Sequence, residues 1–375
     1  MPTWDVCMRV ESLKLFQYRN YDSLTWKPAA GICVFVGKNA AGKTNILESV
    51  FLCALGRSHR TAHDGELIQS GKAEGMVALR VKTRLGTRTI RCQLAIKERK
   101  RVSLDGKPLE RSGELMGCLN AVMFSPEDLD LVKGGPGGRR RFLDMELSQL
   151  YPVYYYTLQR YNGVLKQRNM LLKTPQAQND PTLTVWDAQL AELGADITRR
   201  RAAFVQELAG LAGGLHGRMT AQTERLEILY QPNLPPVADE LLAQAMQKEL
   251  AANLERDIAR GSTSAGPHRD DLNFLINGTD ARVFGSQGQQ RTAALAAKLS
   301  EIPFVESVRG EKPVLLLDDV FSELDAHRQA ALLKAVLGCQ TFITCTHLEE
   351  LAFLGAKRMK VYTVENGVVT MGANN

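Results

Sequence analysis

The chain has 375 residues, a formal net charge of +6 and 44% hydrophobic residues, which is typical of a folded protein of two or three domains. It contains no apolar run long enough for a membrane span, and its N-terminus lacks the pattern of a secretory signal. The seven cysteines are scattered and form no C-x-x-C pair, so we expect reduced thiols in a cytoplasmic protein without a zinc site. Residues 1–7 precede the first expected strand, and whether they belong to the native start stays open.

The N-terminal segment predicts strands that lead to a glycine-rich loop. Alternating apolar and polar residues predict a strand over 9–16, and a second, short strand follows at 24–26. The apolar stretch 31–36 predicts a buried strand, and the pattern after 43 predicts a helix that ends near 55. Between them lies a complete G-x-x-x-x-G-K-[ST] sequence in the strand–loop–helix context that a phosphate-binding loop requires.

This loop predicts binding of ATP with Mg²⁺. Its backbone N–H groups are expected to surround the phosphates, Lys43 to reach the β- and γ-phosphates, and the Thr44 hydroxyl to bind Mg²⁺. Arg19 and Asn20 follow the first strand and either reach the nucleotide or form a surface turn. The complete loop comprises Gly37, Lys38, Asn39, Ala40, Ala41, Gly42, Lys43 and Thr44.

The middle of the chain predicts a change of architecture. Residues 76–104 alternate as antiparallel strands, with a hairpin turn at Asp105 and Gly106. The pattern from 139 to about 255 is helical, with long helices expected over 186–215 and 239–254. We therefore predict an α/β head formed by residues 1–122 and 260–375, split by a helical arm of residues 123–259.

An apolar strand over 314–317 ends in two adjacent carboxylates, Asp318 and Asp319. Two buried carboxylates side by side repel each other unless a cation lies between them, which indicates a metal site. We expect Asp318 to bind Mg²⁺ together with Thr44, and Asp319 to orient the attacking water.

Three further positions complete the expected site. Ser286 and Gly288 begin a helix shortly before Asp318, where they form either an ordinary helix cap or a phosphate site for the nucleotide of a second subunit. Asp325 would lie at the same subunit interface. His347 follows the next strand and is expected to act as a sensor of the γ-phosphate.

The order of these motifs resembles the ATP-binding-cassette ATPases, and their wide separation resembles the SMC-type branch. The short arm and several local sequences closely resemble the bacterial RecF family, from about Met8 to the C-terminus. The fold class implied is α/β, a split P-loop ATPase head with an inserted helical arm. The sequences that carry the resemblance are 16–21, 37–45, 124–128, 138–144, 266–271 and 315–325.

The resemblance implies a protein of recombinational DNA repair, replication and the SOS response. Such proteins form ATP-dependent homodimers on gapped or junction DNA, hydrolyse ATP slowly, and help RecO and RecR to load a recombinase. Two positions depart from the general cassette pattern, because Asp319 stands where many have Glu and Gln287 replaces a glycine. Both also suit the RecF pattern, although the shorter reach of Asp319 puts efficient hydrolysis in doubt.

Several alternatives remain open on the sequence alone. The basic run Lys97–Arg101 is our first candidate for DNA contact, whereas the arginine runs 139–141 and 199–201 contact phosphates or face solvent. The protein could instead be the nucleotide-binding subunit of a membrane transporter, a non-catalytic scaffold or a P-loop kinase. A transporter subunit would bind a membrane partner and not DNA, and a scaffold would show no turnover. A kinase needs an acceptor site, which the sequence does not indicate.

Overall fold

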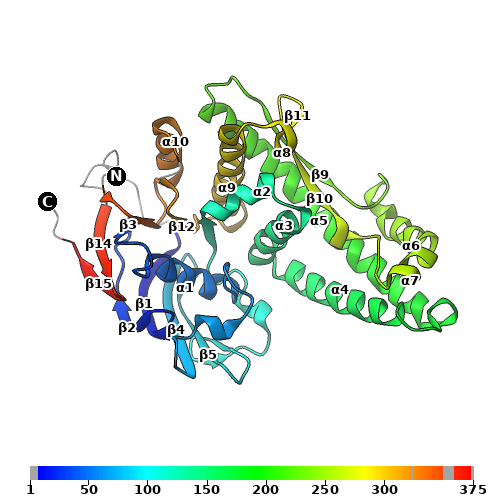
Figure 1. Ribbon diagram of the computed structural model, residues 1–375, viewed down its shortest axis with the longest axis horizontal. Helices are drawn as coiled ribbons and strands as arrows, with labels where there is room; N and C mark the ends of the chain where they lie inside the picture. Colours follow the sequence, from blue (N-terminus) through cyan, green and yellow to red (C-terminus); the bar gives the residue numbers. More distant parts are fainter. Residues whose placement is uncertain (1–6, 322–323, 349–358, 373–375) are drawn as a thin grey trace.

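The molecule is elongated, with an α/β head at one end and a helical arm that extends from it (Figure 1). The first and the last strands of the described chain both lie in the head. The computed structural model describes residues 7–321, 324–348 and 359–372. Ser322 and Glu323, which belong to the motif that ends at Asp325, lie outside the described residues. Within the described part of the chain, no helix has both the length and the hydrophobicity that a membrane crossing requires.

A mostly parallel sheet forms the centre of the head, in the order β15-β14-β3-β13-β12-β8. β3, from the start of the chain, lies between β13 and β14, from its end. The two ends of the sequence therefore interleave in one sheet, as the split-head prediction requires. The strands are β3 (Ile32–Val36), β8 (Ala121–Phe124), β12 (Val314–Asp318), β13 (Thr341–Cys345), β14 (Met359–Glu365) and the antiparallel β15 (Val368–Met371).

Both faces of this sheet are covered, which explains the continuous apolar sequence of β3. Ile32 and Val34 pack in the core on the side of the arm, whereas Cys33 and Phe35 pack in the core on the opposite side. Successive side chains of a strand point to opposite faces, so a strand buried on both sides has no polar position.

A second, antiparallel sheet covers the far side of the head, in the order β2-β1-β4-β5-β6-β7. Helix α1 (Lys43–Leu55) shares a core with both sheets, so its first turn is fixed beside the ends of the parallel strands. The strands of the second sheet are β1 (Arg9–Tyr18), β2 (Tyr21–Trp26), β4 (Glu74–Thr83), β5 (Gly86–Ala95), β6 (Arg101–Leu104) and β7 (Lys107–Pro108).

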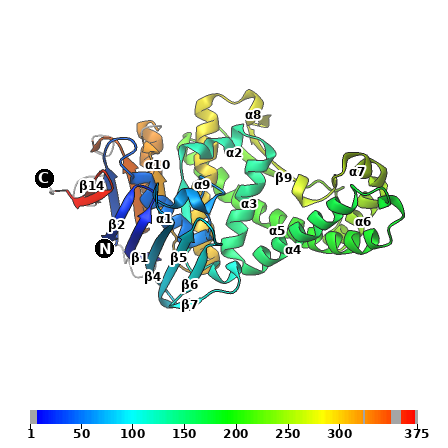
Figure 2. The same ribbon diagram turned by 60° about the horizontal axis from the view of Figure 1, so that its bottom comes forward.

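The arm is built around α5 (Thr182–Met219), a helix of 38 residues that is longer than the sequence predicted (Figure 2). The preceding helical segment is broken at Tyr151, because Pro152 cannot continue α3 and instead begins α4. The remaining arm helices are α2 (Asp130–Lys133), α3 (Pro136–Leu150), α4 (Pro152–Leu171), α6 (Leu242–Ala252) and α7 (Leu254–Arg260).

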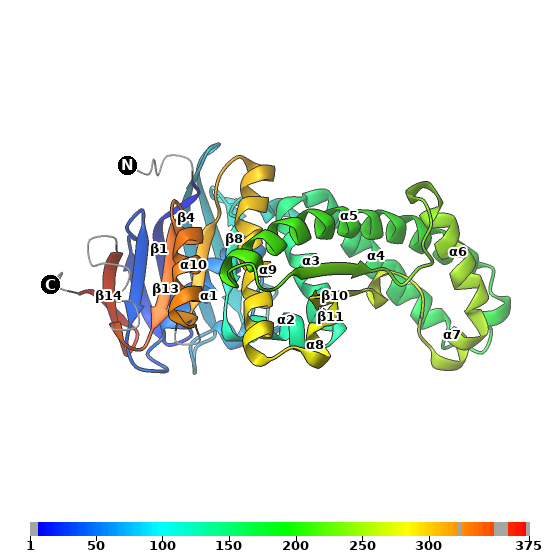
Figure 3. The ribbon, with the colours of Figure 1, turned by 90° about the horizontal axis from the view of Figure 1, so that it is seen from above.

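A small three-stranded sheet accompanies these helices, and the sequence did not predict its first strand. β9 (Leu226–Gln231) pairs with β10 (Asp271–Ile276), which pairs with β11 (Thr279–Asp280). Helices α8 (Ala281–Phe284) and α9 (Gln287–Arg309) follow, and α9 lies between head and arm (Figure 3). α10 (Ala326–Val336) lies beside α9 on the head.

At two places, strand pairing crosses the predicted domain boundaries. The boundary between residues 122 and 123 falls inside β8, whose register with β12 runs from Ala121 to Phe124. The boundary at 260 separates β10 from β9, although the two strands pair along their whole length. We therefore propose that the arm begins after Phe124 and extends through β11.

Candidate nucleotide-binding site

The glycine-rich loop joins β3 to α1 in a conformation that restricts its sequence. Gly42 has a φ angle of 111°, and Ala40 is also left-handed, with a φ angle of 65°. A Cβ atom at Gly42 would collide with the side chain of Asn20, and one at Gly37 with the carbonyl oxygen of Val364. These close approaches explain why glycine is required at both ends of the loop.

A cavity of about 510 Å³ lies over this loop. Lys43 lines it, is largely buried, and donates from its Nζ to the carbonyl oxygens of Gly37 and Lys38, the latter at 3.0 Å. Of the predicted positions, the lining contains Arg19, Asn20, Asn39, Ala40, Gly42, Lys43, Thr44, Asp318 and Asp319.

Three elements that are distant in the sequence bring oxygen atoms together in this cavity. Asp318, at the end of β12, accepts hydrogen bonds from the hydroxyls of Thr44 at 2.8 Å and Thr344 at 2.7 Å. The backbone N–H of Asp319 donates to the Thr344 hydroxyl at 2.9 Å. Thr344 in β13 therefore holds the carboxylate of Asp318 and the backbone of Asp319, a role that the sequence analysis missed.

Behind the loop lies a buried carboxylate, Glu48 of α1. It accepts two hydrogen bonds from the Arg19 guanidinium, at 2.7 and 2.8 Å, and one from the Ser58 hydroxyl at 2.5 Å. Although burial raises the pKa of Glu48, the hydrogen bonds from Arg19 and Ser58 outweigh it, so that its pKa lies below the ordinary value.

Neighbouring polar side chains complete this wall of the cavity. Asn20 donates from Nδ2 to the carbonyl oxygen of Ala41 at 2.8 Å and accepts from Asn45 at the same distance. Arg60 also lines the cavity and donates to Asn45 at 3.1 Å, although no motif had singled it out. Arg19 and Asn20 therefore line the cavity, and Asn20 also holds the phosphate loop in place through Ala41.

The remaining predicted residues lie elsewhere. Ser286 caps α9, where its hydroxyl accepts from the N–H of Gln289 at 3.2 Å. Arg328 of α10 donates to the carbonyl oxygen of Gly288 at 3.2 Å and pairs with Asp325, so these positions form one signature cluster, Ser286, Gly288, Asp325 and Arg328. Neither this cluster nor the exposed His347 lines the 510 Å³ cavity.

The basic runs differ in their surroundings. Arg139 and Arg201 are buried and form ion pairs with Asp271 and Asp270 respectively, so they stabilise the arm and do not face solvent. By contrast, Arg101 within the run Lys97–Arg101 is 75% exposed and pairs with nearby Glu98, whereas Lys100 of the same run pairs with Asp64 at 2.8 Å. This exposure leaves the segment accessible to a phosphate, and its contact with DNA stays a prediction.

The parallel sheet, the phosphate loop after β3 and the carboxylates after β12 define an ATP-binding-cassette ATPase head of the SMC type. A family model described as "RecF/RecN/SMC N terminal domain" matches residues 9–370. The chain belongs to the RecF family.

Two relatives document this membership. The chain is 45% identical over 367 residues to the DNA replication and repair protein RecF of Lachnoclostridium phytofermentans, which covers 97% of this chain and 100% of that protein. It is 43% identical over 365 residues to the protein of the same name from Alkaliphilus oremlandii, with 96% and 100% covered.

Solved structures agree with these relatives. A structure described as the recombination mediator protein RecF-ATP in the RecFOR pathway superimposes with a TM-score of 0.91 at 34% identity, covering 98% of each chain. The Smc head domain of Pyrococcus furiosus, with an extended coiled coil, gives a TM-score of 0.56 at 14% identity, covering 97% of this chain and 96% of that one. The latter likeness concerns the fold alone.

Proposed function

We propose that this protein is an ATP-dependent DNA-binding protein of recombinational repair and replication, with weak ATPase activity. The observation that carries the proposal is the convergence of Thr44, Asp318 and Thr344 in one cavity. A hydroxyl and a carboxylate from two distant motifs meet there, as a site for a nucleotide and its metal ion requires. The ATP named for a solved RecF structure supports the same ligand.

The residues of the cavity fit ATP and Mg²⁺. Mg²⁺ prefers hard oxygen ligands and usually keeps several waters beside one or two carboxylates, which matches Thr44, Asp318 and the adjacent Asp319. When bound, the ion would neutralise phosphate charge. Lys43 would exchange its loop carbonyls for the β- and γ-phosphates, while Asp319 would orient water, weakly because of its short side chain.

Arg19 and Asn20 would hold the phosphate loop against the nucleotide, and His347 would sense the γ-phosphate from the end of β13. The signature cluster supports a homodimer in which ATP lies between two heads. Because Ser286 and Gly288 lie outside the cavity of their own chain, a second copy is needed to bring them to the γ-phosphate. ATP would then join the subunits, and hydrolysis would separate them.

We further propose that the dimer binds gapped or single-strand/double-strand junction DNA in the bacterial cytoplasm, as part of the response to DNA damage. RecO and RecR are the proposed partners, supported by the RecFOR pathway named for the solved relatives. Membership in the RecF family favours this function over a transporter subunit, a kinase or a non-catalytic scaffold.

The decisive experiment is sedimentation with ATP and Mg²⁺, with and without gapped duplex DNA. We expect an ATP-dependent dimer for the wild type, and we expect Ser286→Arg to remain monomeric while it binds ATP normally. The Asp319→Asn variant should trap the dimer by slowing hydrolysis. Equal dimerisation of wild type and Ser286→Arg would disprove the sandwich arrangement.

A further inference from the structure

The junction between head and arm contains a second cavity, of about 330 Å³, that the proposed nucleotide chemistry does not use. Four arginines line it, and we call it the arginine cavity. Arg57 follows α1, Arg140 and Arg141 lie in the first turns of α3, and Arg201 lies in α5. Two sequences that resemble the RecF family, 138–144 and 266–271, supply much of its wall.

One of the four arginines is already neutralised. Arg201 forms ion pairs with Asp144 at 2.7 Å and with Asp270 at 2.9 Å. Asp144 also accepts a hydrogen bond from the hydroxyl of Tyr154 at 2.6 Å. Among the described residues that line the cavity, Asp144 is the one carboxylate, and these two donors already engage it.

The other three arginines lack a directly paired carboxylate. Carboxylates farther away compensate two of them in part, because Asp271 and Asp270 act on Arg140, and Asp144 acts on Arg57. Within the described residues, Arg57, Arg140 and Arg141 form no ion pair with a carboxylate. Arg140 donates to the carbonyl oxygen of Asp270 at 2.8 Å, and Arg141 donates to that of His59 at 3.0 Å. A carbonyl satisfies one N–H group but cancels no charge. Burial, together with the positive charge of Arg201, lowers the pKa of Arg140.

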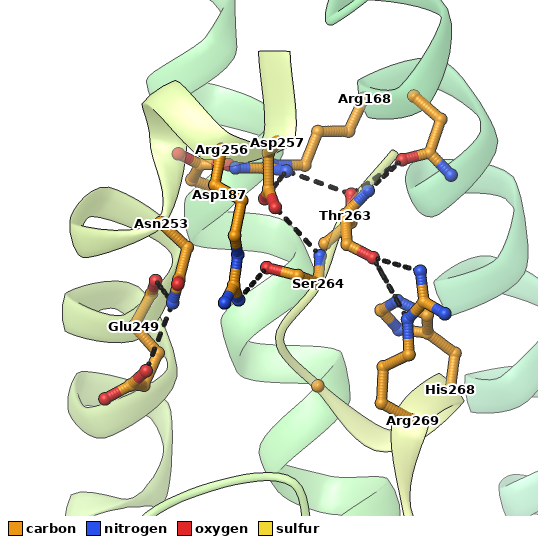
Figure 4. A network of polar contacts seen from close by, with 12 residues as sticks. Arg168, Asp187, Glu249, Asn253, Arg256, Asp257, Thr263, Ser264, His268 and Arg269 are labelled. Atoms are coloured by element: carbon orange, nitrogen blue, oxygen red, sulfur yellow. Dashed lines mark hydrogen bonds and ion pairs between the residues drawn. The ribbon is translucent and has the colours of Figure 1, made fainter. Parts of the chain in front are cut away.

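The opposite wall is neutral and rigid. Tyr161 donates to Nδ1 of His268 at 2.7 Å, and Nε2 of His268 donates to the carbonyl oxygen of Thr263 at 3.0 Å. Burial lowers the pKa of His268 to about 4, so the ring is uncharged at neutral pH. Figure 4 shows Thr263 held in turn by Arg168, which pairs with Asp257 at 2.8 Å. Recognition in this cavity therefore depends on the arginines.

Three guanidinium groups without a directly paired carboxylate favour an anion whose oxygens can accept several N–H bonds, and a phosphate group matches the planar geometry of the guanidinium donors. The N-terminus of the 15-residue helix α3 adds partial positive charge from the same side. Arg57 and Arg141 are exposed, so the cavity opens to solvent and admits a phosphate that belongs to a polymer.

We propose that the arginine cavity binds a backbone phosphate of DNA where the head meets the arm. This inference rests on the DNA binding of the proposed function and adds a specific contact to it. Each phosphate that a cationic side chain neutralises releases counterions, so binding that uses this cavity depends on salt in a measurable way.

The test is fluorescence anisotropy with a labelled gapped duplex that lacks terminal phosphates, in ATP and Mg²⁺ and at roughly 50 to 200 mM salt. Arg57→Gln and Arg140→Gln should each weaken binding about tenfold and reduce the slope of log K against log salt by about one. Arg57→Lys keeps the charge and should retain the wild-type slope. Thermal unfolding of each variant checks that it is folded.

Arg160→Gln is the matched control, because Arg160 is exposed on α4 beside the cavity but does not line it. It should bind as the wild type does. Wild-type affinity and salt slope in Arg57→Gln and Arg140→Gln would overturn the assignment. So would the finding that inorganic phosphate binds in a manner that depends on Arg57 but does not weaken the binding of DNA. If the wild type itself binds no duplex in any nucleotide state, the proposed function fails instead.

Discussion

At the scale of single residues, two segments that line the nucleotide cavity are held in place by a carboxylate that does not itself line it. Glu48 is fully buried behind the phosphate loop and holds Arg19, whose backbone adopts a left-handed conformation with a φ angle of 53°. Ser58, two residues before Arg60, binds the same carboxylate. Glu48 thus links the turn after β1 to the segment after α1, and both line the cavity.

Glu48→Gln tests this arrangement. Removing the charge leaves Arg19 without its partner, so we expect the free energy of unfolding to fall by about 2–4 kcal/mol at pH 7. Because the pKa of Glu48 is lowered in the folded state, its contribution is present above the unfolded value of about 4.3 and is lost as pH falls through the folded value. Urea unfolding between about pH 7 and pH 3 should therefore show the two proteins converging in acid.

Glu66→Gln provides the control, since Glu66 is exposed near Arg19 and contacts it only through its backbone carbonyl. We expect little change in stability from this substitution. A wild-type advantage over Glu48→Gln that stays constant down to the lowest pH would contradict the role given to the ionised carboxylate.

At this scale, the sequence revealed residues that belong to a local motif and missed those that act through tertiary contacts. Lys43, Thr44 and Asp318 were predictable because neighbouring residues create their context. Thr344 and Arg60 were not, because their roles depend on partners that are distant in the sequence. The same limit hid the ion pairs that bury Arg139 and Arg201.

At the scale of elements, Arg328 links α9 and α10 by polar contacts, in addition to the apolar core that the two helices share. Arg328 donates to the Thr292 hydroxyl at 2.7 Å and to the carbonyl oxygen of Gly288, and it pairs with Asp325. The start of α9 therefore keeps a fixed position relative to α10. In the proposed dimer, this rigidity presents Ser286 to the partner head.

Arg328→Gln should loosen the signature cluster without reaching the nucleotide cavity. We expect ATP to bind the monomer normally, whereas ATP-dependent dimerisation weakens about tenfold or more, as the loss of charge-assisted hydrogen bonds predicts. Titration of dimer formation by light scattering measures the change. Lys334→Gln, at an exposed position of the same helix, should leave dimerisation unaffected, and an equal loss in both variants would argue against a specific role of Arg328.

Element prediction succeeded where the periodicity was strong and failed where pairing decided the structure. The strand before the phosphate loop and the helix after it were correctly predicted. β9 was missed because its short alternation lies within a helical region and its partner, β10, follows only some forty residues later. The break before Pro152 was also missed, although proline removes the N–H that a continuing helix needs.

At the scale of the whole molecule, the two groups of predicted site residues lie in different places. The phosphate loop and Asp318 line the cavity, whereas the signature cluster lies outside it. The sequence predicted the split head from motif order, and the interleaved sheet agrees. The domain boundaries were not predictable, because β8 and β10 each pair with strands that are distant in the sequence.

Mixing two inactive variants tests whether the site is shared between subunits. Lys43→Ala and Ser286→Arg should each abolish ATP turnover. A heterodimer of the two variants nevertheless contains one ATP site at the subunit interface in which both residues are intact. Because Ser286→Arg is not expected to form homodimers, mixing equal amounts should restore turnover to at most about half of the wild-type rate, the value reached when every chain is in a heterodimer and the two sites act independently. A phosphate-release assay measures it. A mixture as inactive as its components would indicate that the two residues do not serve one site.

The interleaved sheet also has a consequence for biosynthesis. β3 lies between β13 and β14, so the strand that carries the phosphate loop has neither neighbour until the last part of the chain has been translated. At roughly 5–20 residues per second, a ribosome exposes β3 for tens of seconds before its partners emerge. The arm, by contrast, is one continuous stretch of the chain, from after Phe124 through β11, and can acquire structure on the nascent chain. The nucleotide site is thus completed only near the end of synthesis, which keeps truncated chains from forming an ATP-competent head.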